Sequence, residues 1–360
     1  MKKFISVVLA LTMLLSLAAC GSKTETSVAP AASSTAAPAA PAEKKISGTV
    51  VVCSSAPTEC LDAIKEGFEE AYPDCEVEFI TCSAGEGIAK VQAEGDNPSI
   101  DVFYSGLNQG DGTKYKDIFE PYVSKYDSIL PKEYQSNNGY YNYDHLSTVV
   151  LCVNKELEKE LGLNIKSYKD LLDPKLKGKI IFSDPNSSSA AWNNVANWFA
   201  CYGNDSAEAW EVMEGLIANG MVVGSSSSTC FKGVDKGEYV VGITYEDGAS
   251  TLLKNGSTAV DMRYATDGAS AWAFAAAIVK KAPNMDAAKA MIDWLQSPEG
   301  QQYQADLGII RVTNPDVTGA DSVLPASKDV KWVVRDVDWL VANKNAMLEK
   351  WNAVVQKYAK

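Results

Sequence analysis

The feature that most constrains this fold is the alternation of short β-branched runs with segments whose apolar residues recur at helical spacing. Residues 49–53 form such a run and end in a Ser-Ser-Ala-Pro turn, after which Leu61, Ile64 and Phe68 follow at helical intervals. The same succession of strand, polar turn and helix returns along the chain, which is typical of βα units around a parallel sheet. The sequence therefore predicts an α/β fold.

The alternation continues through the rest of the chain. We expect further strands at residues 76–82, 100–104, 147–153, 179–182, 221–223, 239–245 and 270–279. We expect further helices at residues 87–94, 190–202, around Phe231, 287–295 and 340–358.

Two lobes are expected, because 360 residues exceed the roughly 50 to 250 residues of an ordinary domain. The run at 147–153 is long enough to leave one lobe and enter the other. We assign residues 46–148 and 268–312 to lobe 1, and residues 149–267 and 313–360 to lobe 2, although the C-terminal helices can belong to either lobe. Each lobe is expected to be a mainly parallel sheet flanked by helices, with a ligand cleft between the lobes.

The N-terminus indicates export from the cytoplasm. Lys2 and Lys3 precede an apolar run, so residues 1–19 have the pattern of a secretory signal peptide. The sequence Leu-Ala-Ala-Cys-Gly at its end resembles a bacterial lipobox, which implies cleavage before Cys20 and lipid attachment to its sulfur. Residues 20–45 are rich in Ala, Pro, Ser and Thr and are expected to be a disordered linker. The mature protein is thus expected outside the cytoplasm, held to the lipid bilayer through Cys20.

Charge and composition exclude several classes of function. The formal net charge is −13, which disfavours nucleic acid and anionic lipid surfaces as partners. The chain has a single histidine, His145, so multi-histidine metal sites and most histidine-based acid and base chemistry lose their commonest residue. We expect neither an enzyme nor a bound cofactor.

The polar turns after the expected strands predict the binding site. In open α/β sheets, ligands bind beyond the carboxyl ends of the strands, so the turns at 54–55, 83–86, 105–106, 184–189, 225–229 and 244–250 should converge on one cleft. The candidate ligand contacts are Ser54, Ser55, Ser83, Ser187, Ser188, Ser189, Ser227, Ser228, Thr229, Tyr245 and Glu246.

Serine clusters before helices favour an anionic ligand. Ser187 to Ser189 and Ser227 to Thr229 each stand before a helix, where free backbone N–H groups and the positive helix end attract negative charge. Plain helix capping explains any one of these clusters equally well. Glu246 could accept hydrogen bonds from sugar hydroxyls, and Arg311 is either an anion partner or a surface cation.

The order of several motifs resembles a known family. Residues 68–72 with 85–86, 93–102, 168–180, 236–246 and 287–301 are similar to the extracellular solute-binding proteins of bacterial ABC transporters. The resemblance covers nearly all of residues 46–360 and lies within the branch that binds ferric ion, phosphonates and hexose phosphates. It implies the type II periplasmic-binding-protein fold and a monomer that closes its lobes on a solute and delivers it to a membrane permease.

The ligand is left open between several classes. We expect a small anionic solute such as a hexose phosphate or phosphonate, with ferric ion as the alternative and a polyamine binder or surface hydrolase ranked lower. The iron-binding relatives carry two adjacent tyrosines at the end of the second-lobe strand, where this chain has Tyr245 and Glu246. The adjacent Tyr140 and Tyr141 lie before the crossing into the second lobe, where the family has no ligands.

The cysteines after Cys20 are odd in number, so at least one has no intramolecular partner. Cys60 with Cys75, or Cys53 with Cys82, could pair in an oxidising compartment, and the sequence does not decide between free thiols and either pair.

Overall fold

The computed structural model describes residues 45–224 and 226–359. Residues 45–360 form one compact unit. The expected signal segment, Cys20 and nearly all of the expected linker lie outside the described residues. No helix among the described residues is long and apolar enough to cross a membrane.

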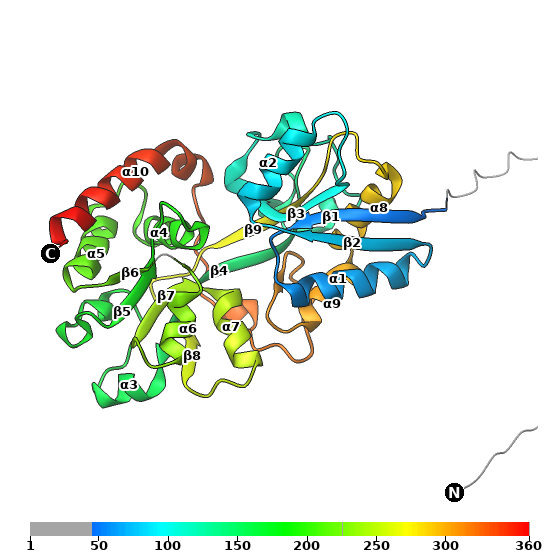
Figure 1. Ribbon diagram of the computed structural model, residues 1–360. Coiled ribbons are helices and arrows are strands. Elements are labelled where there is room, and N and C mark those ends of the chain that lie inside the picture. Colours follow the sequence, from blue (N-terminus) through cyan, green and yellow to red (C-terminus); the bar gives the residue numbers. More distant parts are fainter. Residues whose placement is uncertain (1–44, 225, 360) are drawn as a thin grey trace, which may run out of the picture. The chain divides into compact units, whose positions relative to one another are not determined.

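The strands and helices alternate, as the sequence predicts (Figure 1). The strands are β1 (Gly48–Ser54), β2 (Cys75–Thr81), β3 (Val102–Asn108), β4 (Asn142–Asn154), β5 (Ile180–Ser183), β6 (Val222–Gly224), β7 (Val241–Tyr245), β8 (Val260–Arg263), β9 (Ala271–Ile278) and β10 (Arg311–Val312). The α-helices are α1 (Thr58–Ala71), α2 (Ala84–Glu94), α3 (Lys155–Glu160), α4 (Ser189–Tyr202), α5 (Ala207–Ala218), α6 (Thr229–Asp235), α7 (Glu246–Lys254), α8 (Met285–Gln296), α9 (Pro298–Asp306) and α10 (Val337–Tyr358). Short 3-10 turns are η1 (Gln109–Asp111), η2 (Lys116–Ile118), η3 (Asp127–Ile129), η4 (Lys132–Tyr134), η5 (Lys169–Leu172), η6 (Pro174–Leu176) and η7 (Ser327–Asp329).

The sheet has two halves that share β4. The strand order is β2-β1-β3-β9-β4-β7-β5-β6, with β8 and β10 also paired to β4. Within one half β1 runs parallel to β2 and β3, and within the other β5 runs parallel to β6 and β7. The antiparallel strands β9 and β4 lie between these parallel groups. The fold is the expected two-lobed α/β arrangement, with antiparallel strands at its centre.

Strand β4 is where the chain passes from one lobe to the other. Its residues from Asn142 to Thr148 pair with β9, and its residues from Val149 to Val153 pair with β7. Every residue of this strand is buried. This explains why its sequence does not alternate between apolar and polar residues. The lobe boundary at residues 148 and 149 stays a prediction, and this change of partner supports it.

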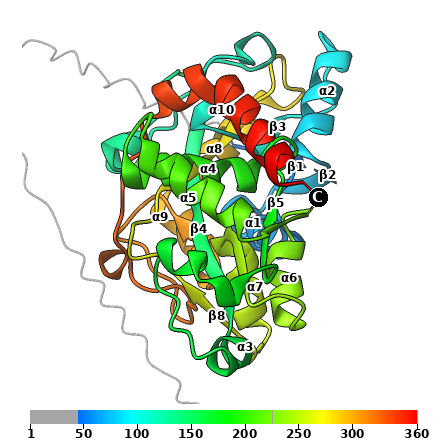
Figure 2. The same cartoon turned by 90° about the vertical axis from the view of Figure 1, so that its left-hand side faces the viewer.

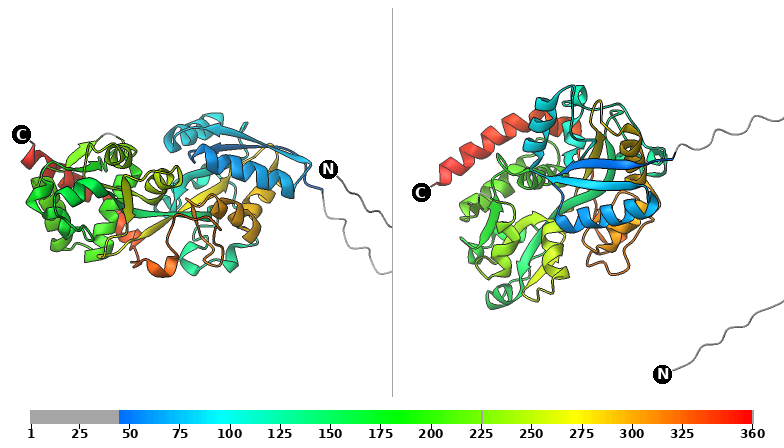
Figure 3. Two further views of the ribbon diagram at one scale, coloured as in Figure 1. Left: turned by 90° about the horizontal axis from the view of Figure 1, so that it is seen from below. Right: turned by 45° about the vertical axis from the view of Figure 1, so that its right-hand side comes forward.

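Each half of the sheet has its own apolar core. Helices α1 and α8 pack on the first half, where Phe68, Met291 and Trp294 are buried. Helices α4, α5 and α10 pack on the second half around Trp198 and Trp351, and Figure 2 shows α10 lying across this lobe. The views in Figure 3 show β4 and β9 running between the two groups of helices. The crossing strands therefore join two separately packed bodies.

The structure adds elements that the sequence analysis did not place. The polar turn expected over 244–250 is in fact the start of α7, so Glu246 and Asp247 stand in the first turn of a helix, where acidic residues are common. Strand β4 begins at Asn142, before the expected start at residue 147, and this places His145 inside the strand. Helix α5 and strand β8 were not expected either.

Candidate functional site

A cavity of about 450 Å³ lies where the ends of strands from both lobes meet. We call it the serine cavity. Its polar wall consists of Ser55, Ser105, His145, Ser147, Ser189, Ser227, Ser228, Lys232, Tyr245, Asp247 and Thr251, and its aromatic wall of Phe231, Trp272 and Phe274. Sites of this size, mostly apolar with a few converging polar groups, are typical for small ligands.

Four helices begin at the serine cavity. The N-cap of α1 (Pro57), the first residue of α4 (Ser189), the N-cap of α6 (Ser228) and the first turn of α7 (Asp247) all line it. Helices α1, α6 and α7 have no side-chain cap, whereas Ser188 caps α4 by accepting a hydrogen bond from the Ala191 N–H. At α1 and α7 this leaves N–H donors and positive potential directed at the space in front of the helix, whereas the first N–H groups of α6 are hydrogen-bonded to Ser226 and Ser227. The cavity therefore favours an anionic group.

The cavity wall at the irregularity within β3, between Tyr104 and Leu107, turns through an uncommon backbone conformation. Ser105 has a φ of 57°, in the left-handed region that residues with a Cβ seldom adopt. Its carbonyl accepts a hydrogen bond of 2.6 Å from the Ser55 hydroxyl, and its own hydroxyl lies 3.3 Å from His145 Nε2. Backbone strain of this kind collects at functional sites. The turn presents both serines to the cavity.

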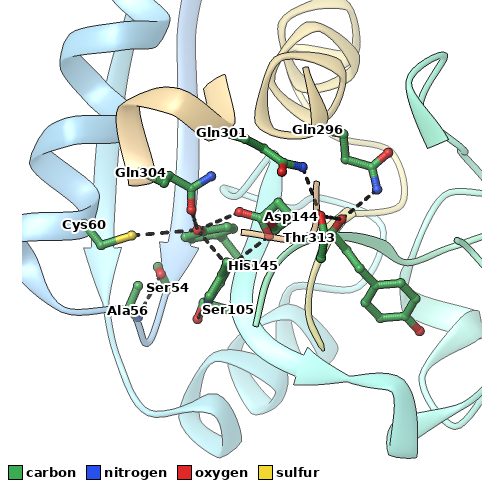
Figure 4. Close-up of polar contacts among 12 residues, drawn as sticks. Ser54, Ala56, Cys60, Ser105, Asp144, His145, Gln296, Gln301, Gln304 and Thr313 are labelled. Carbon is green, nitrogen blue, oxygen red and sulfur yellow. Dashed lines mark hydrogen bonds and ion pairs between the residues drawn. The ribbon is translucent and has the colours of Figure 1, made fainter. Parts of the chain in front are cut away.

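A buried polar network fixes the histidine behind that turn (Figure 4). His145 Nδ1 lies 3.0 Å from Asp144 Oδ1, and the Tyr104 hydroxyl donates to Asp144 Oδ2 at 2.9 Å. The Tyr104 hydroxyl also lies 3.0 Å from the side-chain oxygen of Gln304 on α9. Burial alone lowers the pKa of His145, but the Asp144 carboxylate outweighs this effect and the net shift is upward. The imidazole is therefore held with Nδ1 towards the carboxylate and Nε2 towards the Ser105 hydroxyl in the cavity wall.

The cavity wall also carries a carboxyl group with a raised pKa. Ser147 Oγ donates to Asp247 Oδ1 at 3.0 Å. Burial, followed by the charge of Glu246, raises the pKa of Asp247 to about 7. Burial raises the pKa of Tyr245 to about 12, so its phenol is neutral at physiological pH. Asp247 can therefore act as a hydrogen-bond donor as well as an acceptor near neutral pH.

A second cavity, of about 600 Å³, adjoins the first. We call it the arginine cavity. It shares Ser55, Ser105, Ser189, Trp272 and Phe274 with the serine cavity and adds residues from α2, η1, α4 and α10. Arg335 lines it, with its guanidinium 5.0 Å from the centre of the Trp272 ring.

The structure brings some predicted site residues together. Ser55, Ser189, Ser227, Ser228 and Tyr245 line the serine cavity. Trp192 lines the arginine cavity and Trp272 lines both cavities, whereas Tyr104 is buried in the network behind them.

Other predicted contacts lie outside both cavities and serve local structure. Ser54 is fully buried and its hydroxyl accepts from the Ala56 N–H. Ser83 forms a capping box with Glu86 at the start of α2. Ser187 lies in the turn before α4, Ser188 caps that helix, and Thr229 begins α6. For Ser188, helix capping was the alternative weighed from the sequence, and the structure shows this capping bond.

Glu246 also lies outside the cavities, contrary to its expected role as a contact. Its carboxylate is fully buried and pairs with Arg311 across 3.0 Å. Arg311 is buried too, so it is neither a surface cation nor a residue of the cavity wall. The physical reason is the start of α7, which turns Glu246 inward and presents the next residue, Asp247, to the cavity.

The sequence analysis missed Asp247, His145, Ser105 and Arg335 as site residues. Asp247 and Ser105 lie within the polar turns that were expected to form the cleft, so the sequence pattern could have identified both residues. His145 gave no signal because it lies within a strand, and Arg335 comes from a segment far along the chain that only tertiary structure brings to the cleft.

Comparisons with known proteins bear on the family and the fold. The sequence profile of bacterial extracellular solute-binding proteins matches residues 56–302. An uncharacterised protein of Haemophilus influenzae is 29% identical over 262 residues, which cover 71% of this chain and 75% of that protein.

Two solved structures share the fold. The periplasmic binding protein AfuA of Actinobacillus pleuropneumoniae, with fructose-6-phosphate bound, has a TM-score of 0.69 at 24% identity and covers 86% of this chain and 99% of its own. Iron-bound HitA of Pseudomonas aeruginosa has a TM-score of 0.69 at 20% identity and covers 84% of this chain and 98% of its own. At these identities the likeness shows the fold alone.

Proposed function

Because this chain belongs to the bacterial extracellular solute-binding proteins, which act outside the cytoplasm as substrate-binding components of ABC importers, we propose that it captures a small anionic, phosphorylated organic solute. A hexose phosphate or a phosphonate fits this description. The lobes close over the solute and the loaded protein docks on the membrane permease. We further propose that lipid on Cys20 holds the protein at the membrane.

The observation that carries the anionic ligand is the set of uncapped helix N-termini at the serine cavity. Pro57 and Tyr245 precede α1 and α7 without a side-chain cap, so N–H donors from different elements face one space. A phosphoryl group has three acceptor oxygens and at least one negative charge, which match such a set of donors.

The rest of the cavity suits the body of a polar organic solute. Asp247, His145 and Ser147 can exchange hydrogen bonds with hydroxyl groups, while Trp272 and Phe274 offer apolar faces to a carbon skeleton. Hydroxyl groups trapped in a closed cleft need such partners, because an unpaired buried polar group costs about 1 to 3 kcal/mol.

Ferric ion is the second candidate. Tyr245 and Asp247 supply oxygen donors to the serine cavity, and HitA, which shares the fold, is an iron-bound protein. A highly charged cation gains from several anionic ligands, however, and Lys232 and the helix N-termini give the cavity the opposite polarity. The geometry therefore favours the organic anion.

A thermal-shift and calorimetric screen tests the proposal. We expect glucose 6-phosphate or a small alkyl phosphonate to raise the melting temperature of the wild-type protein and to bind with micromolar or better affinity. The Tyr245→Phe variant separates the candidates, because removing one phenol should abolish a coloured ferric complex but change phosphate affinity only severalfold. Ferric binding with a visible charge-transfer band, and no shift with any phosphate or phosphonate, would reverse the ranking.

A further inference from the structure

The wall of the arginine cavity carries more positive than negative charge. Arg335, Lys114 and Lys344 line it, and Asp111 is the only acidic residue in its described wall. Arg335 comes from the segment before α10 and Lys344 from α10 itself, whereas Lys114 and Asp111 follow β3 in the other lobe. The cationic groups thus face the same space from both lobes.

The guanidinium of Arg335 is positioned by neutral groups only. Its Nε donates to Ser270 Oγ at 2.7 Å, and its Nη2 donates to the carbonyl oxygens of Asn193 at 3.0 Å and Ser270 at 3.3 Å. Its Nη1 donates to the side-chain oxygen of Asn193. Among the residues that the structure describes, no carboxylate forms an ion pair with Arg335. The charge is held in a defined place, yet no protein anion neutralises it.

The partly buried setting of Arg335 makes an uncompensated charge costly. Burial lowers the pKa of Arg335 to about 9, so the cation itself is disfavoured where it stands. A bound anion would stabilise the charged form of this arginine, because a charge-assisted hydrogen bond replaces the solvation that burial removes.

Lys344 and Lys114 add further positive charge to the wall of the arginine cavity. Lys344 Nζ lies 4.9 Å from the centre of the Trp192 ring, and Lys114 Nζ lies 4.7 Å from that of Tyr115. The Asp111 carboxylate accepts from the Asn108 N–H at 2.9 Å, so part of its hydrogen-bonding capacity is already used.

We propose that the arginine cavity is a second anion subsite, so that the transported solute carries two separated anionic groups. This inference rests on the proposed function, which places the first anionic group in the serine cavity. The shared wall at Ser189 and Trp272 joins the two spaces, and one solute can extend along it. The solute class is then a bisphosphorylated sugar or an organic phosphate that also bears a carboxylate.

Isothermal titration of the wild-type protein with glucose 6-phosphate and with fructose 1,6-bisphosphate tests the subsite. We expect the bisphosphate to bind at least about tenfold more tightly, the gain typical of an added charge-assisted contact. Lys344→Gln should remove most of this advantage and leave monophosphate affinity within about twofold, whereas Arg335→Lys should lower bisphosphate affinity more than monophosphate affinity. Lys350→Gln is the matched control, because Lys350 lies on the same helix with its Nζ 4.1 Å from the Trp210 ring centre, away from the cavity.

The outcomes separate the inference from the proposed function. Equal affinity for the two ligands, or an equal loss for both ligands in Lys344→Gln and Arg335→Lys, overturns the second subsite and leaves the phosphate proposal standing. Absence of binding by both ligands in the wild-type protein overturns the phosphorylated-solute proposal, and the second subsite falls with it.

Discussion

Glu246 and Arg311 form a buried ion pair, with Oε1 of the carboxylate 3.0 Å from Nη2 of the guanidinium. Tyr264 donates a further hydrogen bond to the same carboxylate oxygen, and Arg311 also donates to Ser327 Oγ and to the carbonyl oxygen of Pro325. The pair joins the start of α7 to β10 and to the segment that follows it. It therefore ties elements that are far apart in the sequence, directly behind the serine cavity.

We predict that removing either partner of this pair lowers the stability of the folded protein. Arg311→Met and Glu246→Gln should each lower the free energy of unfolding by about 3 to 5 kcal/mol, because each leaves a buried group without its partner. Urea denaturation followed by circular dichroism measures the loss. The double variant Glu246→Gln/Arg311→Met should lose less than the two single losses combined, and purely additive losses would contradict the coupling.

We predict that anion binding to the serine cavity strengthens as the pH falls through about 7. Burial and Glu246 raise the pKa of Asp247 to about 7, so the carboxyl group becomes neutral below that value and no longer repels an anion. A bound anion disfavours the carboxylate further, and binding should be accompanied by proton uptake. Calorimetric titration of phosphate ester at pH 6 and pH 8, in buffers of different ionisation enthalpy, counts the protons.

Asp247→Asn is the control for this pH dependence. The amide keeps the size of the side chain but cannot titrate, so at pH 8 the variant should bind more tightly than the wild type, and at pH 6 the two proteins should bind about equally. The ligand's own titration is common to both proteins and cancels in the comparison. Because the folded-state pKa of Asp247 lies above its usual value of 3.8, wild-type stability should also decline between about pH 4 and pH 7, and Asp247→Asn should lack that decline. A wild-type profile that matches that of Asp247→Asn would refute the role of Asp247.

Much of the fold, but less of the site, could be predicted from the sequence. Hydrophobic periodicity located β1, α4 and α10 because local patterns determine such elements. The serine turns before α4 and α6 identified part of the cavity wall for the same reason. Arg335 was missed because it reaches the cavity through the packing of the C-terminal segment, which no local pattern records. Glu246 was misplaced by one position, since the start of α7 decides whether it or Asp247 faces the cavity.

We predict that Cys53 and Cys82 form a disulfide in the exported protein. Their sulfur atoms lie 2.8 Å apart at the ends of neighbouring strands, whereas no contact joins Cys60 to Cys75 among the described residues. Burial raises the pKa of Cys53 to about 12, so the more exposed Cys82 should react first with a disulfide-exchanging oxidoreductase.

Mass spectrometry of the unreduced, alkylated protein measures this pairing. A Cys53–Cys82 cross-linked peptide is expected, while Cys60, Cys75, Cys152, Cys201 and Cys230 should be recovered as alkylated thiols after unfolding. Reduction should lower the free energy of unfolding by about 3 kcal/mol, as for a loop of this length. Recovery of alkylated Cys53 and Cys82 from unreduced protein that was exported to an oxidising compartment would disprove the pairing.

We predict that Ser189 contributes to binding and that Ser187, two positions earlier, does not. Ser189 is the first residue of α4 and lines both cavities, whereas Ser187 lies in the preceding turn with its hydroxyl 3.4 Å from the Asp184 carbonyl oxygen. Ser189→Ala removes one hydroxyl donor but keeps the backbone N–H, so phosphate affinity should fall about fivefold to tenfold, the value of one hydrogen bond. Ser187→Ala should stay within twofold of the wild type. Both variants should melt within a few degrees of the wild type, because neither hydroxyl caps α4, and calorimetric titration at fixed salt compares their affinities. Equal losses in the two variants would indicate a general effect on the turn and would remove Ser189 from the site.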